Sequence, residues 1–241
     1  MNKMNVYIEF NGVAGSGKST ISHQLHKVFK SSNIPVVSYQ QLFDEYVENS
    51  LWKTKTLILL FSLDGLKLAW NTIQIIRILK IPINKLKFVP YMILTQLLIN
   101  HFKTNGKVII SDEGVIQYLV SVLFDRKIDT LDFEIYLKNI LKILSNNSCF
   151  ISINLHLNSS QILSRLSKRK DGCSRLDNIS NSKRKRITSI QINNFKIIRK
   201  SIKDIPHIDI NAKNKIDYNA NLILDILKRE YGVCCIEKYY K

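Results

Sequence analysis

A glycine-rich segment between two regular elements constrains this 241-residue chain more than any other feature of its sequence. Residues 12–20 read GVAGSGKST, the preceding VYIEF (residues 6–10) is a short strand-like run, and residues 20–29 carry apolar side chains at helical spacing. The pattern G-x-x-x-x-G-K-[ST] is filled without a mismatch by Gly12, Gly17, Lys18 and Ser19. We therefore expect a strand, a phosphate-binding loop (P-loop) and a helix in this order.

The loop predicts a site for the phosphates of a nucleoside triphosphate. Its glycines let the backbone turn tightly and aim N–H groups inward, and the following helix adds its positive N-terminal end. Lys18 is expected to reach the β and γ phosphates, and the Ser19 hydroxyl to complete the coordination of Mg²⁺. Thr20 fits a first helical turn better than a ligand role. The residues expected at ATP are Gly12, Val13, Ala14, Gly15, Ser16, Gly17, Lys18, Ser19 and Thr20.

The segment KVIISDEG (residues 107–114) is an apolar run that ends in two carboxylates. We expect a buried parallel strand with Asp112 and Glu113 at its C-terminal edge, where open α/β sheets bind their ligands. Asp112 is the expected partner of Mg²⁺, with Ser19. The alternative is a surface strand that ends in an ordinary acidic turn.

A basic segment, SQILSRLSKRKDGCSRLDN, occupies residues 160–178. Arg165 and Arg169 are four residues apart, which predicts a helix with one basic face, and a glycine-containing loop then leads to Arg175. Phosphoryl transfer needs positive charge over the γ-phosphate, and the planar fork of Arg suits it. Arg169 and Arg175 are therefore catalytic candidates. A solvated basic helix or a nucleic-acid patch is the alternative, because KRKR at 183–186 extends the charge.

The rest of the chain alternates between strand and helix patterns, which builds a parallel sheet with helices on both faces. Residues 51–102 are helical and strongly apolar, with breaks at Pro82 and Pro90, and we interpret them as a helical insertion over an acceptor site. Further strands are expected at 34–39, 149–157 and 207–211, and further helices at 131–144 and 216–229. The prediction is one α/β domain over residues 1–241, with three layers and about five parallel strands.

Three segments, IEFNGVAGSGKST, VIISDEG and SRLSKRKDGCSR, resemble in this order the nucleotide-kinase branch of P-loop proteins, thymidylate-kinase-like enzymes in particular. The resemblance implies the three-layer P-loop NTPase fold and use of Mg²⁺ and ATP. It also implies a lid at about residues 165–186, with Arg165, Arg169 and Arg175 as lid candidates, and an adenine near the loop after residues 207–211. The implied activity is transfer of the γ-phosphate of ATP to a small-molecule acceptor.

One residue departs from that family's pattern. Members that phosphorylate nucleoside monophosphates typically follow the Asp at the strand end with Arg, which helps to hold the acceptor's phosphate, whereas this chain has Glu113. A carboxylate repels a phosphate but can accept the proton of a hydroxyl, as a general base does. A nucleoside, sugar or lipid-linked hydroxyl therefore competes with a nucleotide as the expected acceptor.

The balance of 36 Lys and Arg against 19 Asp and Glu gives a net charge of +17, which favours anionic partners. Two alternatives to a small-molecule kinase follow. One is an NTP-hydrolysing switch or nucleic-acid-binding ATPase. The other is peripheral contact with a membrane, in which the apolar insertion rests on lipid and basic residues meet anionic head groups.

Cellular location is predicted from cysteines and apolar stretches. Cys149, Cys173, Cys234 and Cys235 lack the spacing of a metal site and read as free thiols in a reducing cytoplasm. The apolar stretch 88–102 is shorter than the roughly 20 residues of a membrane span, so no transmembrane helix is expected. Residues 1–10 carry a charge at Lys3 and include the predicted first strand, so we expect no cleavable signal peptide.

Overall fold

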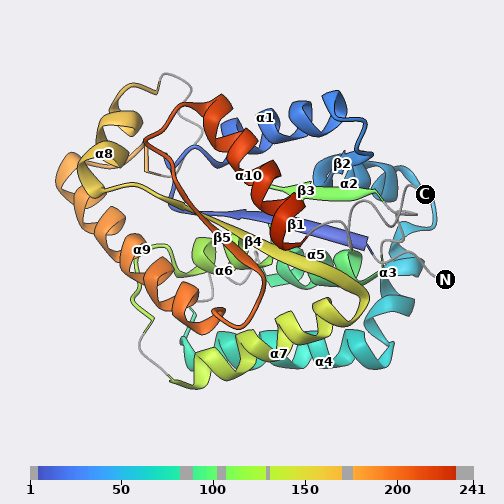
Figure 1. Cartoon of the computed structure of the whole chain (residues 1–241). Coiled ribbons are helices and arrows are strands. Elements are labelled where there is room, and N and C mark those ends of the chain that lie inside the picture. Colours follow the sequence, from blue (N-terminus) through green and yellow to red (C-terminus); the bar gives the residue numbers. More distant parts are fainter. Residues whose placement is uncertain (1–4, 82–88, 102–106, 129–130, 170–175, 232–241) are drawn as a thin grey trace.

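The computed structural model describes residues 5–81, 89–101, 107–128, 131–169 and 176–231. Its centre is a parallel five-stranded sheet in the order β2-β3-β1-β4-β5, which confirms the expected α/β class (Figure 1). The strands are β1 (Asn5–Asn11), β2 (Val36–Ser38), β3 (Val108–Ser111), β4 (Ser148–His156) and β5 (His207–Asn211). Because all strands run the same way, their carboxyl ends meet at one edge, on the left in Figure 1.

Helices cover both faces of the sheet and complete three layers. One face packs against α1 (Lys18–Ser31) and α10 (Ile216–Glu230), around a core that includes Phe10 and Leu25. A second core, around Phe133 and Phe150, fills the other face. Its helices include α2 (Tyr39–Glu48), α4 (Leu63–Ile78), α5 (Val89–His101), α6 (Val115–Leu123), α7 (Leu131–Asn147) and α9 (Asn181–Ser201).

The apolar segment 51–102 forms α4, α5 and a shorter helix, α3 (Trp52–Leu60). Pro90 lies in the first turn of α5, where a missing N–H removes no helical hydrogen bond, so it stands at the start of a helix. The expected break at Pro82 lies outside the described residues. The structure adds a break that the pattern missed, at Phe61 and Ser62 between α3 and α4.

The second strand is shorter than expected, because a helix begins inside the predicted range 34–39. Ser38 caps α2: its Oγ accepts a hydrogen bond from the backbone N–H of Gln41 (3.2 Å), and Gln41 Oε1 accepts one from the N–H of Ser38 (3.2 Å). This reciprocal capping box holds Tyr39 in the first helical turn. The strands predicted at 6–10, 149–157 and 207–211 agree with the structure to within about a residue, and the apolar run of the segment 107–114 forms β3.

Candidate active site

The P-loop between β1 and α1 has a backbone that its glycines make possible. Gly15 and Gly17 have φ angles of 85° and 97°, in the left-handed region that side chains disfavour. Gly12 is needed for a different reason, since a Cβ there would lie 2.6 Å from Ser16 Oγ. Ser16 itself is buried, whereas Ser19 and Thr20 are exposed at the start of α1. The loop thus makes a tight turn, and the hydroxyl-bearing residues Ser19 and Thr20 follow it on the exposed surface.

Lys18 is folded back onto this loop. Its Nζ donates hydrogen bonds to the carbonyl oxygens of Gly12 (2.8 Å) and Val13 (3.3 Å). Burial, opposed by the negative charges of Asp112 and Glu113 and aided by Arg169, lowers the pKa of Lys18 to about 8. These three charged groups, from the turn after β3 and from the residues just after α8 (Ser159–Ser167), therefore lie close enough to Lys18 to act on its ammonium.

One cleft of about 410 Å³ opens beside the P-loop. It brings together every predicted catalytic residue that the structure describes, namely Lys18, Asp112, Glu113 and Arg169. The loop contributes Ala14, Gly15, Gly17, Ser19 and Thr20 to its lining, and α6 contributes Gln117 and Tyr118. Gly12, Val13 and Ser16 are buried within the loop and do not line this cleft. Arg175, the remaining candidate, lies outside the described residues.

Ser19 and Asp112 line this cleft together with the loop, and their donor atoms suit Mg²⁺. A hydroxyl and a carboxylate are hard oxygen ligands, and Mg²⁺ commonly takes one or two such protein ligands and completes its octahedron with water and substrate phosphates. In the part of the chain that the structure describes, no group of three or more His, Cys, Asp or Glu could hold a metal ion. Phosphate oxygens and water would have to supply the remaining ligands.

Glu113 stands at the exposed rim of the cleft, on the side of α6. Partial burial of its carboxyl and the charge of Asp112 raise its pKa, and Lys18 lowers it. Ser111 Oγ donates a hydrogen bond to the Glu113 carbonyl (2.8 Å), which fixes the turn. Tyr118 lines the same side, and its hydroxyl interacts with Thr95 of α5. Thr95, a residue of the segment 51–102, thus contacts a side chain that lines the cleft.

Glu9, in the middle of β1, is a site residue that the predicted set lacks. It is fully buried, and its Oε1 accepts hydrogen bonds from the backbone N–H groups of Ile116 (2.8 Å) and Gln117 (3.1 Å). Burial raises its pKa to about 8, and the hydrogen bonds from the start of α6 oppose the shift. Gly114, the N-cap residue of α6, has no side chain that could cap the helix. Glu9 supplies this cap from a neighbouring strand.

Gly114 lies directly against the carboxyl group of Glu9. A Cβ at Gly114 would lie 2.3 Å from the Glu9 carboxyl carbon, closer than any real contact, so only glycine fits. The buried acid and the glycine of SDEG therefore interlock and place Asp112 and Glu113 at the cleft. The sequence did hold a signal for Glu9, because it is the one acidic residue within the apolar run VYIEF.

Arg165 ties the P-loop to the loop after β5. It comes from α8 (Ser159–Ser167), and its guanidinium donates hydrogen bonds to the carbonyls of Ser16 (3.1 Å) and Ala212 (2.7 Å). In the structure Arg165 thus joins these two loops, and the lid role implied by the resemblance stays a prediction. Arg169 is exposed and lines both the main cleft and a neighbouring recess of about 360 Å³ bordered by Arg165, Ala212 and Asn214.

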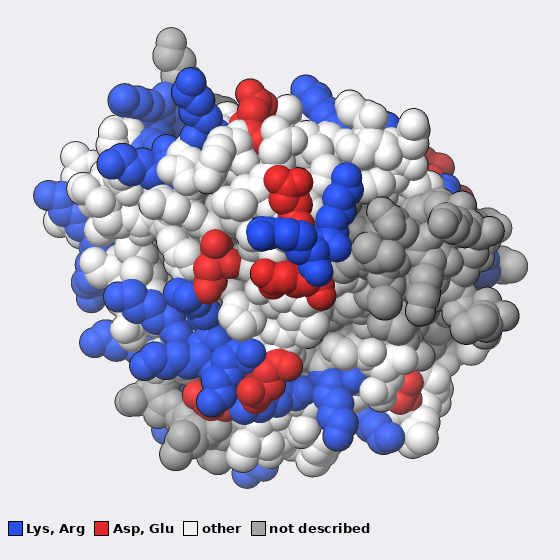
Figure 2. Space-filling model, viewed as in Figure 1, with Lys and Arg blue, Asp and Glu red and all other residues white. Residues whose placement is uncertain are grey.

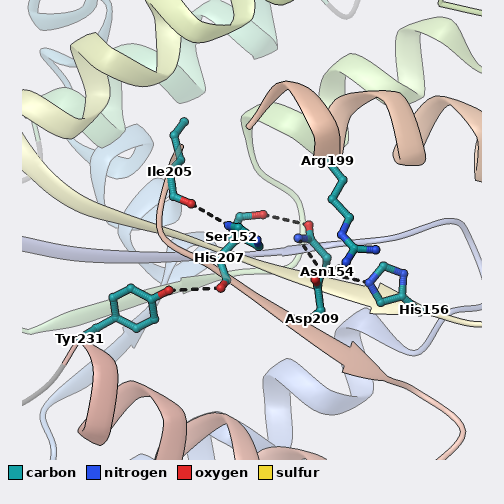
Figure 3. Close-up of polar contacts among 8 residues, drawn as sticks. All are labelled: Ser152, Asn154, His156, Arg199, Ile205, His207, Asp209 and Tyr231. Carbon is teal, nitrogen blue, oxygen red and sulfur yellow. Dashed lines mark hydrogen bonds and ion pairs between the residues drawn. The ribbon is translucent and has the colours of Figure 1, made fainter. Parts of the chain in front are cut away.

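A chain of polar contacts runs across the sheet beneath the P-loop. Asn11 donates to Ser152 Oγ (3.0 Å), Ser152 donates to Asn154 Oδ1 (3.0 Å), and Asn154 donates to Asp209 Oδ1 (3.2 Å). Figure 3 shows its outer end, where Asp209 also meets His156 and Arg199. Burial favours a higher pKa for Asp209, but these contacts together lower it. These contacts hold the ends of β1, β4 and β5 in register at the carboxyl edge of the sheet.

Basic side chains gather over α8 and α9, on the left and lower left of Figure 2. The KRKR run begins α9, but its four residues do not form one solvent-facing patch. Arg184 turns inward and donates hydrogen bonds to the carbonyls of Leu176 (2.8 Å) and Asp177 (2.9 Å). One of the four charges is therefore used to anchor the helix start.

Comparisons with known proteins support the fold. No protein-family model matches the sequence, and no curated protein matches it. A solved structure of deoxyadenosine kinase from M. mycoides with bound dATP is 18% identical, covering 92% of this chain and 99% of that one, with a TM-score of 0.51. Shikimate kinase from Acinetobacter baumannii in complex with shikimate is 14% identical over 93% of each chain, with a TM-score of 0.44, too low to bear on the fold. The chain therefore shares the α/β fold of that deoxyadenosine kinase.

Proposed function

We propose that this chain is an ATP-dependent phosphotransferase that moves the γ-phosphoryl group of Mg-ATP to the hydroxyl of a small acceptor. A single observation carries the proposal: one cleft brings together the side chains that phosphoryl transfer needs. They are the P-loop lysine, a hydroxyl and a carboxylate suited to Mg²⁺, a second carboxylate and an exposed arginine. These are Lys18, Ser19, Asp112, Glu113 and Arg169. The kinase fold, shown by the comparison with deoxyadenosine kinase, is in keeping with it.

The P-loop side of the cleft holds the donor nucleotide in this proposal. Backbone N–H groups of the loop and the start of α1 bind the β and γ phosphates, and Lys18 exchanges its contacts with the Gly12 and Val13 carbonyls for phosphate oxygens. Ser19 and Asp112 hold Mg²⁺, which when bound neutralises charge on the phosphates. The recess bordered by Arg165, Ala212 and Asn214 adjoins this cleft and takes the base.

Glu113 accepts the acceptor's proton. As the acceptor oxygen forms its bond to the γ-phosphorus, the bond from that phosphorus to the bridging β–γ oxygen breaks, and the hydroxyl proton moves to the Glu113 carboxylate. The raised pKa of Glu113 makes it a stronger base than an ordinary carboxylate. Arg169 stabilises the charge of the group in transfer. The products are a phosphorylated acceptor and ADP.

The alternative is an NTP-hydrolysing switch or nucleic-acid-binding ATPase. Its support is the net charge of +17 and the basic surface over α8 and α9. The inward-turned Arg184 weakens that support, because it removes one charge from the KRKR run. We therefore place the kinase first.

An acceptor screen with γ-labelled ATP tests the proposal. The panel holds deoxynucleosides, nucleosides, sugars, lipid alcohols and nucleoside monophosphates, with Lys18→Ala as the control for contaminating kinases. Transfer of label to a hydroxyl acceptor, absent in Lys18→Ala, is the expected result. Transfer to monophosphates alone would remove Glu113 as the base. Hydrolysis that no acceptor changes would favour the ATPase.

A further inference from the structure

Helix α4 exposes a stripe of apolar side chains and buries several polar ones. Leu63, Leu66, Trp70 and Ile73 follow one stripe at spacings of three and four residues, and they are 70%, 49%, 61% and 50% exposed. The buried face of the same helix carries Asn71, Thr72 and Gln74 beside the apolar Leu68 and Ile75. A helix that faces only water has the opposite arrangement, so the outer stripe of α4 is built to be covered.

The buried polar residues fix this orientation. Asn71 Oδ1 accepts a hydrogen bond from Asn139 of α7 (3.2 Å), and Thr72 shares a hydrogen bond with Gln96 of α5 (3.2 Å). Rotating α4 to bury Trp70 would break both contacts and leave buried polar groups without partners. The exposed stripe is therefore a stable feature of the fold.

The stripe continues around a fixed elbow onto α3. The two helices meet at 80°, and Ser62 Oγ accepts a hydrogen bond from the N–H of Gly65 (3.0 Å) to cap α4. A Cβ at Gly65 would lie 2.0 Å from the Leu59 carbonyl oxygen, so glycine lets the helices close on each other. The elbow carries Phe61, 70% exposed. We call the whole set the α3–α4 apolar surface: Leu51, Leu57, Ile58, Phe61, Leu63, Leu66, Trp70 and Ile73.

The charges within the segment that carries this surface are almost all positive. Residues 51–80 contain a single acid, Asp64, and five basic residues, Lys53, Lys55, Lys67, Arg77 and Lys80. All five basic residues are exposed, whereas Asp64 is half-buried. A second copy of the chain, docked about a two-fold axis, would bring these like charges together. An anionic surface complements them.

We propose that the α3–α4 apolar surface docks onto an anionic lipid surface. Its leucines, Phe61 and Trp70 enter the head-group region, and the flanking lysines meet lipid phosphates. Among the described helices none alone is long and apolar enough to cross a membrane, and the pair that reaches this length together, α3 and α4, is bent. The pair is therefore placed along the lipid surface. The elbow lies at the right in Figure 1, away from the carboxyl edge of the sheet.

Vesicle binding tests this proposal without any reference to phosphoryl transfer. The only two tryptophans of the chain, Trp52 and Trp70, lie on α3 and α4, so their fluorescence reports on this surface directly. We expect a blue shift and co-flotation with vesicles that contain phosphatidylglycerol, weakening as salt is added. Pure phosphatidylcholine vesicles should bind at least tenfold more weakly.

Matched substitutions locate the contact. Phe61→Glu and Leu63→Glu should each weaken vesicle binding at least tenfold, whereas Tyr218→Glu should leave it unchanged. Tyr218 is a suitable control because it is 57% exposed and lies on α10, on the opposite face of the sheet. Lys53→Gln and Lys55→Gln should each cost about fivefold. Unchanged circular dichroism melting shows that each variant is folded.

Three outcomes would overturn the proposal. The first is equal binding to neutral and anionic vesicles, and the second is an equal loss in Tyr218→Glu and Phe61→Glu. The third is absence of vesicle binding together with a dimer, measured by sedimentation, that Phe61→Glu dissociates. That last result would assign the surface to a second copy of the chain.

Discussion

The Oε1 atom of Glu9 lies 2.8 Å from the backbone nitrogen of Ile116, a residue 107 positions later in the chain. This hydrogen bond joins the strand that leads into the P-loop to the helix that follows the acidic turn of residues 112–114. Both halves of the candidate active site are therefore positioned from β1. Glu9 does not line the cleft, so its role is to position the turn.

Replacing Glu9 with Gln should remove a pH dependence of stability. The folded protein holds the Glu9 proton up to about pH 8, whereas the unfolded chain holds it only to about pH 4.5, the ordinary value. Between these values unfolding releases a proton, so the free energy of unfolding falls as pH rises. Denaturant unfolding of both proteins from pH 5 to about 8.5 measures the difference, which should move in favour of Glu9→Gln as pH increases. A constant difference would show that Glu9 does not titrate in this window.

Gly114→Ala should destabilise the protein by about 1–3 kcal/mol, because the added methyl overlaps the Glu9 carboxyl. Glu9→Ala removes the overlapping group, so the cost of Gly114→Ala should be smaller in that background. A double-mutant cycle measured by denaturant unfolding gives the coupling. Additive effects would mean that the two residues do not interlock.

The local elements were predictable because each has its own pattern. β1, the P-loop and α1 follow from strand, glycine and helix signals within about 25 residues, and β3 with Asp112 follows from an apolar run. The roles of Glu9 and Arg165 were harder to predict, because their partners lie far away in the sequence. Glu9 accepts a hydrogen bond from the start of the helix after β3. Arg165 donates hydrogen bonds to the carbonyls of Ser16 and Ala212. Because every residue except proline carries the same backbone N–H and C=O groups, the sequence does not show which of them a distant side chain will contact.

The apolar segment 51–102 shows a second limit. Its composition predicted helices, and Pro90 served as a marker for a break, yet the sharp bend is set by Ser62 and Gly65. The pattern also gave no sign of which face of α4 is buried, because both faces contain apolar residues. The contacts of Asn71 and Thr72 with neighbouring helices decide it.

Lys18→Ala should reduce phosphoryl transfer by about a hundredfold or more, since one preorganised charge at the phosphates is lost. Lys18 also contacts the Gly12 and Val13 carbonyls, so a small loss of stability is expected as well. Turnover of labelled ATP, with circular dichroism melting as the fold control, separates the two effects. A folded variant with wild-type turnover would contradict the assignment of the P-loop.

Asp112 and Glu113 should differ in what they serve, although they are neighbours. Asp112→Asn should weaken metal-dependent turnover and raise the Mg²⁺ concentration needed for half-maximal rate. Glu113→Gln should slow the chemical step with little change in ATP affinity, because its carboxylate accepts only the acceptor's proton. Titrations of Mg²⁺ and ATP in both variants measure this. Equal losses of Mg-ATP affinity would make Glu113 a metal-site residue and leave no reason to prefer a hydroxyl acceptor.

The arginines of the basic segment separate a kinase from a nucleic-acid binder. Arg169 lines the cleft and acts on the Lys18 ammonium, so Arg169→Ala should depress turnover strongly, and the same is expected of Arg175→Ala. Neutralising the exposed Lys183, Lys185 and Arg186 should have little effect, because screened surface charges contribute little to a closed site. Arg184 is left in place in this variant because it anchors the start of α9.

A nucleic-acid binder predicts the reverse result for the same variants. Loss of the three surface charges would weaken polynucleotide binding and flatten its salt dependence, because fewer counterions are released on binding. ATP turnover and salt-dependent RNA and DNA binding should therefore be measured on both sets. Steep, salt-sensitive binding that depends on Lys183, Lys185 and Arg186, with turnover indifferent to Arg169 and Arg175, would replace the kinase with the ATPase alternative. We expect turnover to depend on Arg169, since its guanidinium borders both the phosphate cleft and the adjoining recess.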